Sequence, residues 1–131
     1  MELSGEILDF FENEPYHQFA TASLNGQPNI SNIGAKYVRE DGAIIIIDNF
    51  MKKTKDNILA NPKAAILVRR EKMSYQIRGV CKYVDQGSEY EEARKWMKSK
   101  GEKYPAKGAV IFTTESVYDS STKPTAGEKV A

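Results

Sequence analysis

The sequence contains very few residues of the kinds that bind metals or form covalent cross-links. Among its 131 residues there is one cysteine, Cys81, and one histidine, His17. A single cysteine cannot form an internal disulfide, and this pair cannot supply the roughly four ligands that zinc requires. We therefore expect a protein of a reducing compartment with no metal site. We interpret both residues as structural, because lone buried histidines and cysteines are more often packed than catalytic.

Excess charge of one sign and long hydrophobic runs are also absent. The 19 basic and 18 acidic residues leave a formal charge of +1, which argues against a nucleic-acid binder. The longest apolar run, Ala43 to Ile47, is far shorter than the roughly 20 residues that span a bilayer. Met1 to Phe11 has neither the basic start nor the continuous apolar stretch of a signal peptide. These absences predict a cytoplasmic protein that binds neither membrane nor nucleic acid.

Runs of β-branched residues, and runs in which apolar and polar residues alternate, are the main pattern in the sequence. Asn25-Gly26 between two such runs is a strong hairpin signal, because both residues tolerate positive φ. Ser4 and Ser88 are candidate helix caps, the second within the capping-box pattern Ser88-Glu89-Tyr90-Glu91. We predict helices over about 5–14, 54–60 and 89–100, a polar tail over 119–131, and six strands over 17–24, 28–38, 43–48, 64–70, 74–84 and 109–118.

This pattern predicts one domain, residues 1–131, that is mainly β with peripheral helices. Six short strands with a hairpin start favour a small antiparallel barrel, and a β-sandwich is the close alternative. Periodicity alone does not separate the two.

The segment from Lys52 to Lys55 carries the clearest chemistry. It leaves a predicted buried strand and enters a predicted helix with three lysines and Thr54. Helix N-terminal amides, lysine ammonium groups and a hydroxyl together favour a bound phosphate. The alternative is that Thr54 is only the helix N-cap and that the lysines are solvated. The segment has no glycine-rich loop, which disfavours a nucleoside triphosphate.

The order of several motifs resembles the FMN-binding split β-barrel family, which includes pyridoxamine-phosphate oxidases and small FMN-binding proteins of anaerobic bacteria. The motifs are Ala20-Thr21, Gly26-Gln27-Pro28, Lys53-Thr54 and Asn61-Pro62, and a weaker similarity extends from Ile7 to Tyr118. The resemblance implies a six-stranded antiparallel split β-barrel that binds FMN (flavin mononucleotide) near a homodimer interface.

The same resemblance implies which residues contact the cofactor. Lys53 and Thr54 match the pair that contacts the phosphate, and Asn32 is expected at the pyrimidine edge of the flavin. Ile33 and Ile47 are expected against the faces of the ring. The full set of implied FMN contacts is Ser31, Asn32, Ile33, Ile46, Ile47, Asp48, Asn49, Phe50, Lys53 and Thr54. No catalytic residue is assigned, because the cofactor itself carries flavin chemistry.

Three functions remain open at this stage. The first is an FMN-dependent oxidoreductase or electron-transfer protein that acts on a small molecule or a redox-protein partner. The second is a non-catalytic module of the same fold that binds or stores flavin. The third is a barrel that binds single-stranded nucleic acid through a stacking surface, for which the candidates are Tyr16, Phe19, Lys36 and Tyr37. The extra basic residues of pyridoxamine-phosphate oxidases have no evident counterpart, which makes vitamin B6 oxidation the less expected activity.

Overall fold

A single antiparallel sheet of seven strands forms the body of the protein. The computed structural model describes residues 1–131. Three helices accompany the sheet: α1 (Gly5–Asn13), α2 (Lys53–Ala60) and α3 (Ser88–Lys100). The strand order is β2-β1-β5-β6-β7-β4-β3. The strands are β1 (His17–Ala22), β2 (Pro28–Ile33), β3 (Lys36–Val38), β4 (Ile44–Asp48), β5 (Lys63–Arg70), β6 (Met73–Val84) and β7 (Gly108–Asp119).

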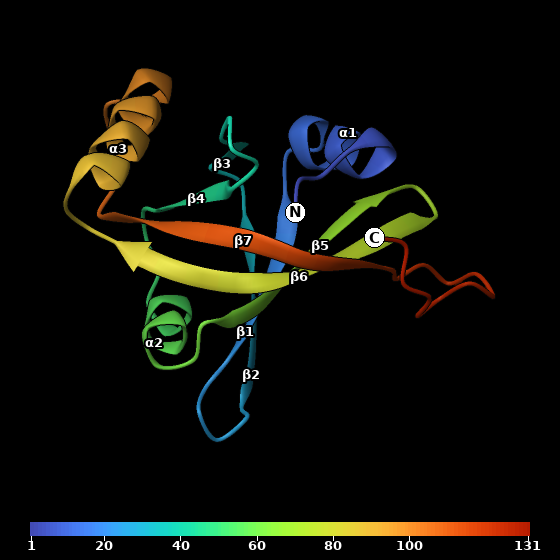
Figure 1. The fold of residues 1–131 in the computed structure, drawn as a ribbon. Helices are drawn as coiled ribbons and strands as arrows, with labels where there is room; N and C mark the ends of the chain where they lie inside the picture. The colour runs from blue at the N-terminus through green and yellow to red at the C-terminus, as the bar shows by residue number, and fades with distance from the viewer.

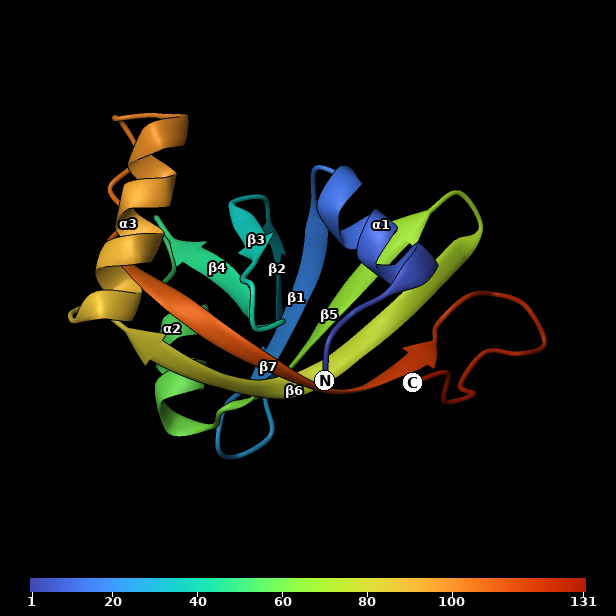
Figure 2. The same cartoon turned by 45° about the horizontal axis from the view of Figure 1, so that its top comes forward.

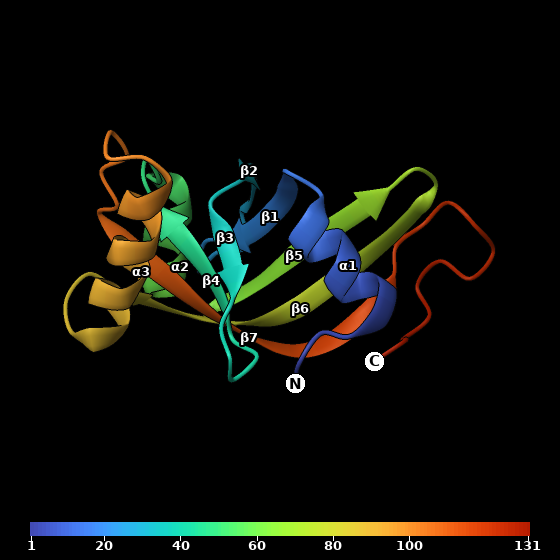
Figure 3. The same ribbon diagram turned by 90° about the horizontal axis from the view of Figure 1, so that it is seen from above.

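The sheet curls into a split barrel, which confirms the predicted mainly β fold with peripheral helices. The long strands β6 and β7 run along the whole molecule (Figure 1), and α3 lies at one end of them while the C-terminal tail lies at the other (Figure 3). Helix α1 lies near β5 on one side, and α2 lies near the β1–β2 hairpin (Figure 2). None of these helices is long and apolar enough to cross a membrane.

The predicted strand count of six is corrected to seven at Gly34. The run predicted as one strand over 28–38 is two strands, because β2 pairs with β1 whereas β3 pairs with β4. These two strands lie at opposite edges of the sheet, so residues 34–35 carry the chain across the split. A Cβ atom at Gly34 would lie 3.0 Å from the Tyr16 ring, which leaves little room for a side chain at the crossing. The covalent chain, rather than a ladder of hydrogen bonds, therefore closes the barrel.

Strand β4 lies between two hydrophobic clusters, and all five of its residues are buried. Ile44 and Ile46 pack inside the barrel in the main core. Ile45 and Ile47 pack on the other face, where Ala93 and Met97 of α3 cover them. This arrangement explains why the predicted buried strand is apolar throughout instead of alternating.

The Asn25-Gly26 hairpin is present, but its loop differs from the two-residue turn that the dipeptide suggests. β1 ends at Ala22 and β2 begins at Pro28, and only Gly26 has a positive φ, +87°. The Ser23 amide donates to the Gln27 carbonyl at 3.1 Å, and the Gln27 amide donates to Ser23 Oγ at 3.0 Å. The Ser23 hydroxyl thus supports a longer loop that needs only one left-handed residue.

Neither predicted serine cap makes a capping hydrogen bond. Ser4 is in the N-cap position of α1 without a side-chain cap, and Ser88 lies inside α3. Gly87 is the N-cap of α3, and its carbonyl accepts from the Glu91 amide at 3.0 Å. Because glycine reaches the φ of +91° found there, the helix starts one residue before the predicted position.

The C-terminal tail folds back along the end of β7. The Val130 amide donates to the Val117 carbonyl at 2.8 Å, and Tyr118 forms an isolated bridge with Lys129. The buried Asp119 carboxylate accepts hydrogen bonds from the Ser121 amide and from Thr125 Oγ1. These contacts order a loop that the sequence alone presents only as polar.

Candidate functional site

A cleft of about 520 Å³ lies where the chain crosses the split of the barrel. Its walls come from the edge strand β2, the crossing residues, the end of β4, the turn that follows β4 and the start of α2. The lining residues are Asn29, Ser31, Asn32, Ile33, Gly34, Ala35, Ile47, Asn49, Phe50, Met51, Lys52, Lys53 and Thr54. None of them is acidic, so the cleft carries only positive formal charge.

The fold brings together all of the predicted contact residues except Ile46 and Asp48. Ile46 points into the barrel core, because the alternation along β4 turns it away from the cleft. Asp48 is fully buried beneath the turn that lines the cleft. The set of implied FMN contacts lacked Asn29, Gly34, Ala35 and Met51, and it also lacked Lys52, which the sequence placed in the cationic segment. The period of two along β2 could have identified Asn29, because it places Asn29 on the same face as Ser31 and Ile33.

The cationic end of the cleft is the start of α2. Lys52 is the N-cap, Lys53 is the first helical residue, and no side chain caps the helix. Both lysines are exposed, so their ammonium groups are free to meet an anion. The amides of the first helical turn have no intrahelical acceptors and carry a partial positive charge.

Thr54 is not the N-cap, which rules out that part of the alternative interpretation. It is buried, and its Oγ1 accepts a hydrogen bond from Asn29 Nδ2 at 3.1 Å and lies 3.3 Å from Ser31 Oγ. Asn29 and Asn57 both donate to Thr21 Oγ1, at 3.3 and 3.0 Å. This polar network joins α2 to the β1–β2 hairpin, and the hydroxyl hydrogen of Thr54 remains available to Ser31 or to a ligand.

Two of the predicted contact residues are asparagines that line the cleft, but their side chains form contacts with other protein groups. Asn49 Nδ2 lies 3.5 Å from Met97 Sδ, and its Oδ1 accepts from the Ala106 amide at 3.0 Å. Asn32 accepts from Gln18 Nε2 at 2.8 Å across the β1–β2 pair. Their side chains therefore hold the walls in place. Because β2 is an edge strand, half of its backbone N–H and C=O groups face away from β1 and can serve a ligand.

Below the cleft, the Asp48 carboxylate is held from two sides. Oδ1 accepts from the Met51 amide at 2.8 Å, and Oδ2 accepts from the Tyr83 hydroxyl at 2.5 Å. Lys107 Nζ lies 4.0 Å away. Burial and the neighbouring carboxylate raise the pKa of Tyr83 well above its usual value, so the phenol keeps its proton and donates a hydrogen bond to Asp48.

A second cavity of about 690 Å³ adjoins the first and shares Gly34, Ala35, Asn49 and Phe50 with it. Its aromatic walls are Tyr16 and Tyr104 together with Trp96, whose ring lies 4.6 Å from that of Tyr37. Phe50 stands between the two cavities with 73% of its surface exposed. An exposed phenylalanine in a concave region provides apolar area that a ligand can cover.

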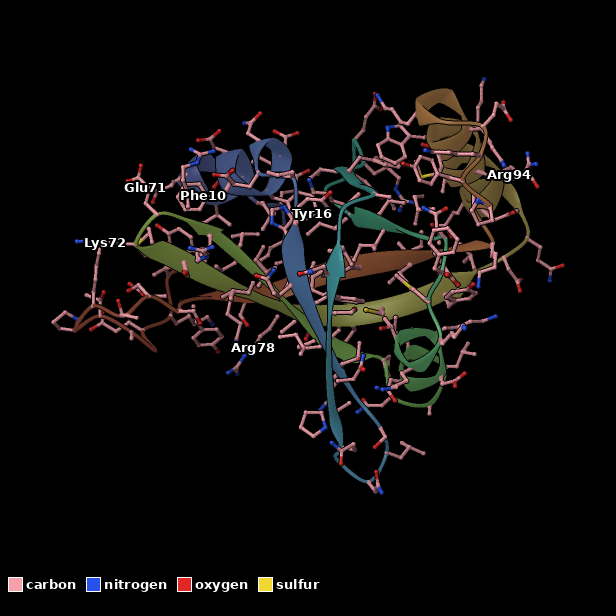
Figure 4. All side chains as sticks on the ribbon, turned by 180° about the vertical axis from the view of Figure 1, so that it is seen from behind. Phe10, Tyr16, Glu71, Lys72, Arg78 and Arg94 are labelled. Atoms are coloured by element: carbon pink, nitrogen blue, oxygen red, sulfur yellow. The ribbon has the colours of Figure 1, made fainter.

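The histidine and the cysteine are buried and line neither cavity. His17 is fully buried, and its Nε2 donates to the Phe11 carbonyl at 2.8 Å while its ring stacks on Phe11. Burial lowers the pKa of His17 and raises the pKa of Cys81 to about 12. Both side chains are therefore uncharged at neutral pH. Arg78, in contrast, projects from the outer face of the sheet (Figure 4), where its guanidinium lies 4.4 Å from the Tyr118 ring.

The fold and the cleft together define a split β-barrel protein with a cationic cleft beside a second cavity that has aromatic walls. The pyridoxamine 5′-phosphate oxidase family matches residues 3–121, and the chain belongs to that family. An uncharacterized protein of Methanocaldococcus jannaschii is 36% identical over 134 aligned residues, which cover 100% of this chain and 89% of the relative.

Solved structures share the same fold. HupZ of Group A Streptococcus superposes with a TM-score of 0.81 at 24% identity, over 98% of this chain and 99% of that one. An FMN-binding protein of Syntrophomonas wolfei gives 0.72 at 19% identity, over 87% and 82% of the two chains. The haem storage protein HutZ of Vibrio cholerae gives 0.71 at 16% identity, over 91% and 95%. At these identities the similarity establishes the fold and leaves the ligand to the residues of the cleft.

Proposed function

We propose that this protein is an FMN-binding flavoprotein of the pyridoxamine 5′-phosphate oxidase family. The observation that carries the proposal is the cleft itself, which has a cationic end and an apolar end within one volume of about 520 Å³. That volume lies within the roughly 300–1,000 Å³ of typical small-molecule sites. Lys53, Thr54 and the first amides of α2 would hold the phosphate. Ile33, Ile47 and the free edge of β2 would contact the ring.

The residues present fit a flavin phosphate in three respects. The start of α2 has no side-chain cap competing for its amides. The two exposed lysines stand beside those amides, and no lining residue is acidic. Finally, the unpaired backbone groups of β2 offer both donors and acceptors, which the pyrimidine edge of a flavin requires.

The chemistry proposed is electron or hydride transfer to a small molecule or a redox-protein partner. A bound flavin supplies that chemistry, so the protein needs to bind, orient and cover it. The adjoining cavity, with Phe50 at the boundary, is open to a substrate. Storage of flavin without turnover is the alternative within the same fold. The exposed rings of Phe50 and Tyr16 near the cleft also support a homodimer in which the second protomer covers the site.

The cleft favours flavin over haem. A haem iron needs an axial ligand, most often histidine, cysteine or methionine. The one histidine and the one cysteine of this chain are buried and do not line the cleft, which leaves Met51 as the only side chain of these three kinds in its lining. A lysine pair at a helix N-terminus, in contrast, is suited to a phosphate.

Absorbance and titration of the purified protein test the proposal. We expect flavin bands in the protein as purified or after addition of FMN, and a released flavin that comigrates with FMN. Turnover with a nicotinamide donor and an acceptor separates an oxidoreductase from a storage module. A colourless protein that takes up no added FMN, measured by quenching of FMN fluorescence, contradicts the proposal.

A further inference from the structure

A partly buried hydrogen bond holds the middle of the turn between β4 and α2 from below. Residues 49–52 form this turn, and all four of them line the cleft. The Met51 amide, in the middle of the turn, donates to Asp48 Oδ1 at 2.8 Å. The conformation of the cationic end of the cleft therefore depends on where the Asp48 carboxylate is fixed.

Tyr83 fixes that carboxylate and also touches the helix. Its hydroxyl donates to Asp48 Oδ2 at 2.5 Å, and Lys55 Nζ of α2 lies 4.9 Å above its ring. The ring packs directly on Gly108, where a Cβ atom would lie 2.2 Å from the hydroxyl oxygen. A single phenol thus connects β6, the start of β7, the turn and the first turn of α2.

We infer that Tyr83 is a positioning residue for phosphate binding, acting through Asp48 on the turn that leads to Lys53 and Thr54. This inference rests on the proposed function for its ligand, whereas its structural part concerns the chain alone. Tyr83 does not line the cleft and so does not touch the ligand.

The physical reason is the cost of a buried carboxylate with too few partners. Asp48 has no exposed surface, and its carboxylate accepts two hydrogen bonds, with one lysine ammonium 4.0 Å away. Removing the phenol hydroxyl leaves one oxygen unsatisfied, which is unfavourable unless the turn shifts or water enters. A shift of the turn displaces the backbone that carries Lys52 and Lys53.

The test uses Tyr83→Phe and compares two ligands that differ only in the phosphate. We expect the dissociation constant for FMN to rise about tenfold, the effect of one unsatisfied buried group. Riboflavin has no phosphate, so its dissociation constant should change less than about twofold by the same argument. Equal weakening of both ligands would indicate a general loss of structure, and no change in either would also overturn the inference.

Two further variants sharpen the comparison. Tyr118→Phe removes a phenol hydroxyl from the far end of β7 and should leave both affinities unchanged. Asp48→Asn alters the acceptor of the same Tyr83–Asp48 hydrogen bond, and it replaces Tyr83→Phe in the test if that variant does not fold. If the two residues act as a unit, the double variant should lose no more FMN affinity than the worse single variant. Additive losses contradict the inference.

Amide hydrogen exchange separates this inference from the proposed function. In the ligand-free protein, we expect faster exchange of the Met51 amide in Tyr83→Phe than in wild type, with no change in Tyr118→Phe. A wild-type protein that binds neither FMN nor riboflavin refutes the proposed function alone. An unchanged Met51 amide in Tyr83→Phe refutes the positioning role, whatever the ligand proves to be.

Discussion

Asn29 Nδ2 of the edge strand β2 donates to Thr54 Oγ1 in the first turn of α2, across 3.1 Å. The residue expected to meet a phosphate is thus also the one that ties the helix to the hairpin. Substituting it changes two properties at once, and the lysine beside it is the cleaner probe of ligand binding.

Lys53→Ala should weaken FMN binding without destabilising the fold. Lys53 is exposed, so its removal should change the free energy of unfolding by less than about 0.5 kcal/mol. Loss of one charge-assisted contact to phosphate should raise the dissociation constant at least about tenfold, because such bonds contribute roughly 1.5–3 kcal/mol and about 1.4 kcal/mol is a factor of ten. Fluorescence titration measures the affinity. Lys72→Ala, at the exposed β5–β6 turn, is the matched control, and equal effects of both variants would exclude a specific role for Lys53.

Thr54→Val should destabilise the protein, whereas Thr54→Ser should not. Valine keeps the shape of threonine but removes one of the two acceptors of Asn29 Nδ2 in a partly buried network, and only Thr21 Oγ1 remains. We expect a loss of about 1–2 kcal/mol in the free energy of unfolding, measured by urea denaturation. Serine retains the oxygen, and its unfolding midpoint should stay closer to wild type. A valine variant as stable as wild type would show that the network does not hold α2.

Gly108→Ala should be more destabilising than an ordinary substitution in a strand. The added Cβ would lie 2.2 Å from the Tyr83 hydroxyl oxygen and 2.4 Å from its Cζ, so the ring must move. Overpacking of this kind costs about 1–3 kcal/mol. Thermal unfolding followed by circular dichroism measures the effect. Ser116→Ala, at a half-buried position of the same strand, provides the baseline, and a Gly108 variant no worse than this one would contradict the packing described here.

Stability should fall as the pH is lowered from 7 to 5, and His17 should cause the fall. Burial lowers the pKa of His17 below its usual 6.5 in the folded state, so the unfolded chain binds more protons over this interval. A positive difference in bound protons makes stability rise with pH, by about 1.4 kcal/mol for each unit of pKa difference. Urea unfolding at several pH values measures the slope. His17→Gln removes the titrating group, and a slope that persists in this variant would assign the effect to other residues.

Local pattern was sufficient to predict most of the elements and several of the cleft residues. The apolar run at Ile44–Ile47 predicts a strand buried on both faces, because no polar position is left for a solvent face. The lysines before Asp56 predict a cationic helix start, which the structure places in the cleft. Both features follow from neighbours in the sequence.

What the sequence did not reveal depends on partners far along the chain. Gly34 reads as an interruption in a strand, but nothing local shows that the two halves pair with opposite edges of the sheet. Asn49 has an amide side chain of the kind that often contacts ligands. In the structure that side chain instead forms contacts with Met97 and Ala106. The role of Asp48 depends in the same way on Tyr83, which lies 35 residues away. The tertiary fold brings such partners together, and the periodicity of the sequence does not predict them.

The folded-back tail has a consequence for how the molecules behave in concentrated solution. β4 pairs only with residues 108–112 of β7, which would leave the far half of that side of β7 open to another strand. The backbone amides and carbonyls of Val117 and Asp119 instead form hydrogen bonds with residues 127–131. An open strand edge is a template for aggregation. The tail therefore protects this strand edge from pairing with another molecule. A protein shortened to Ser120 should aggregate at concentrations where the full chain remains in solution.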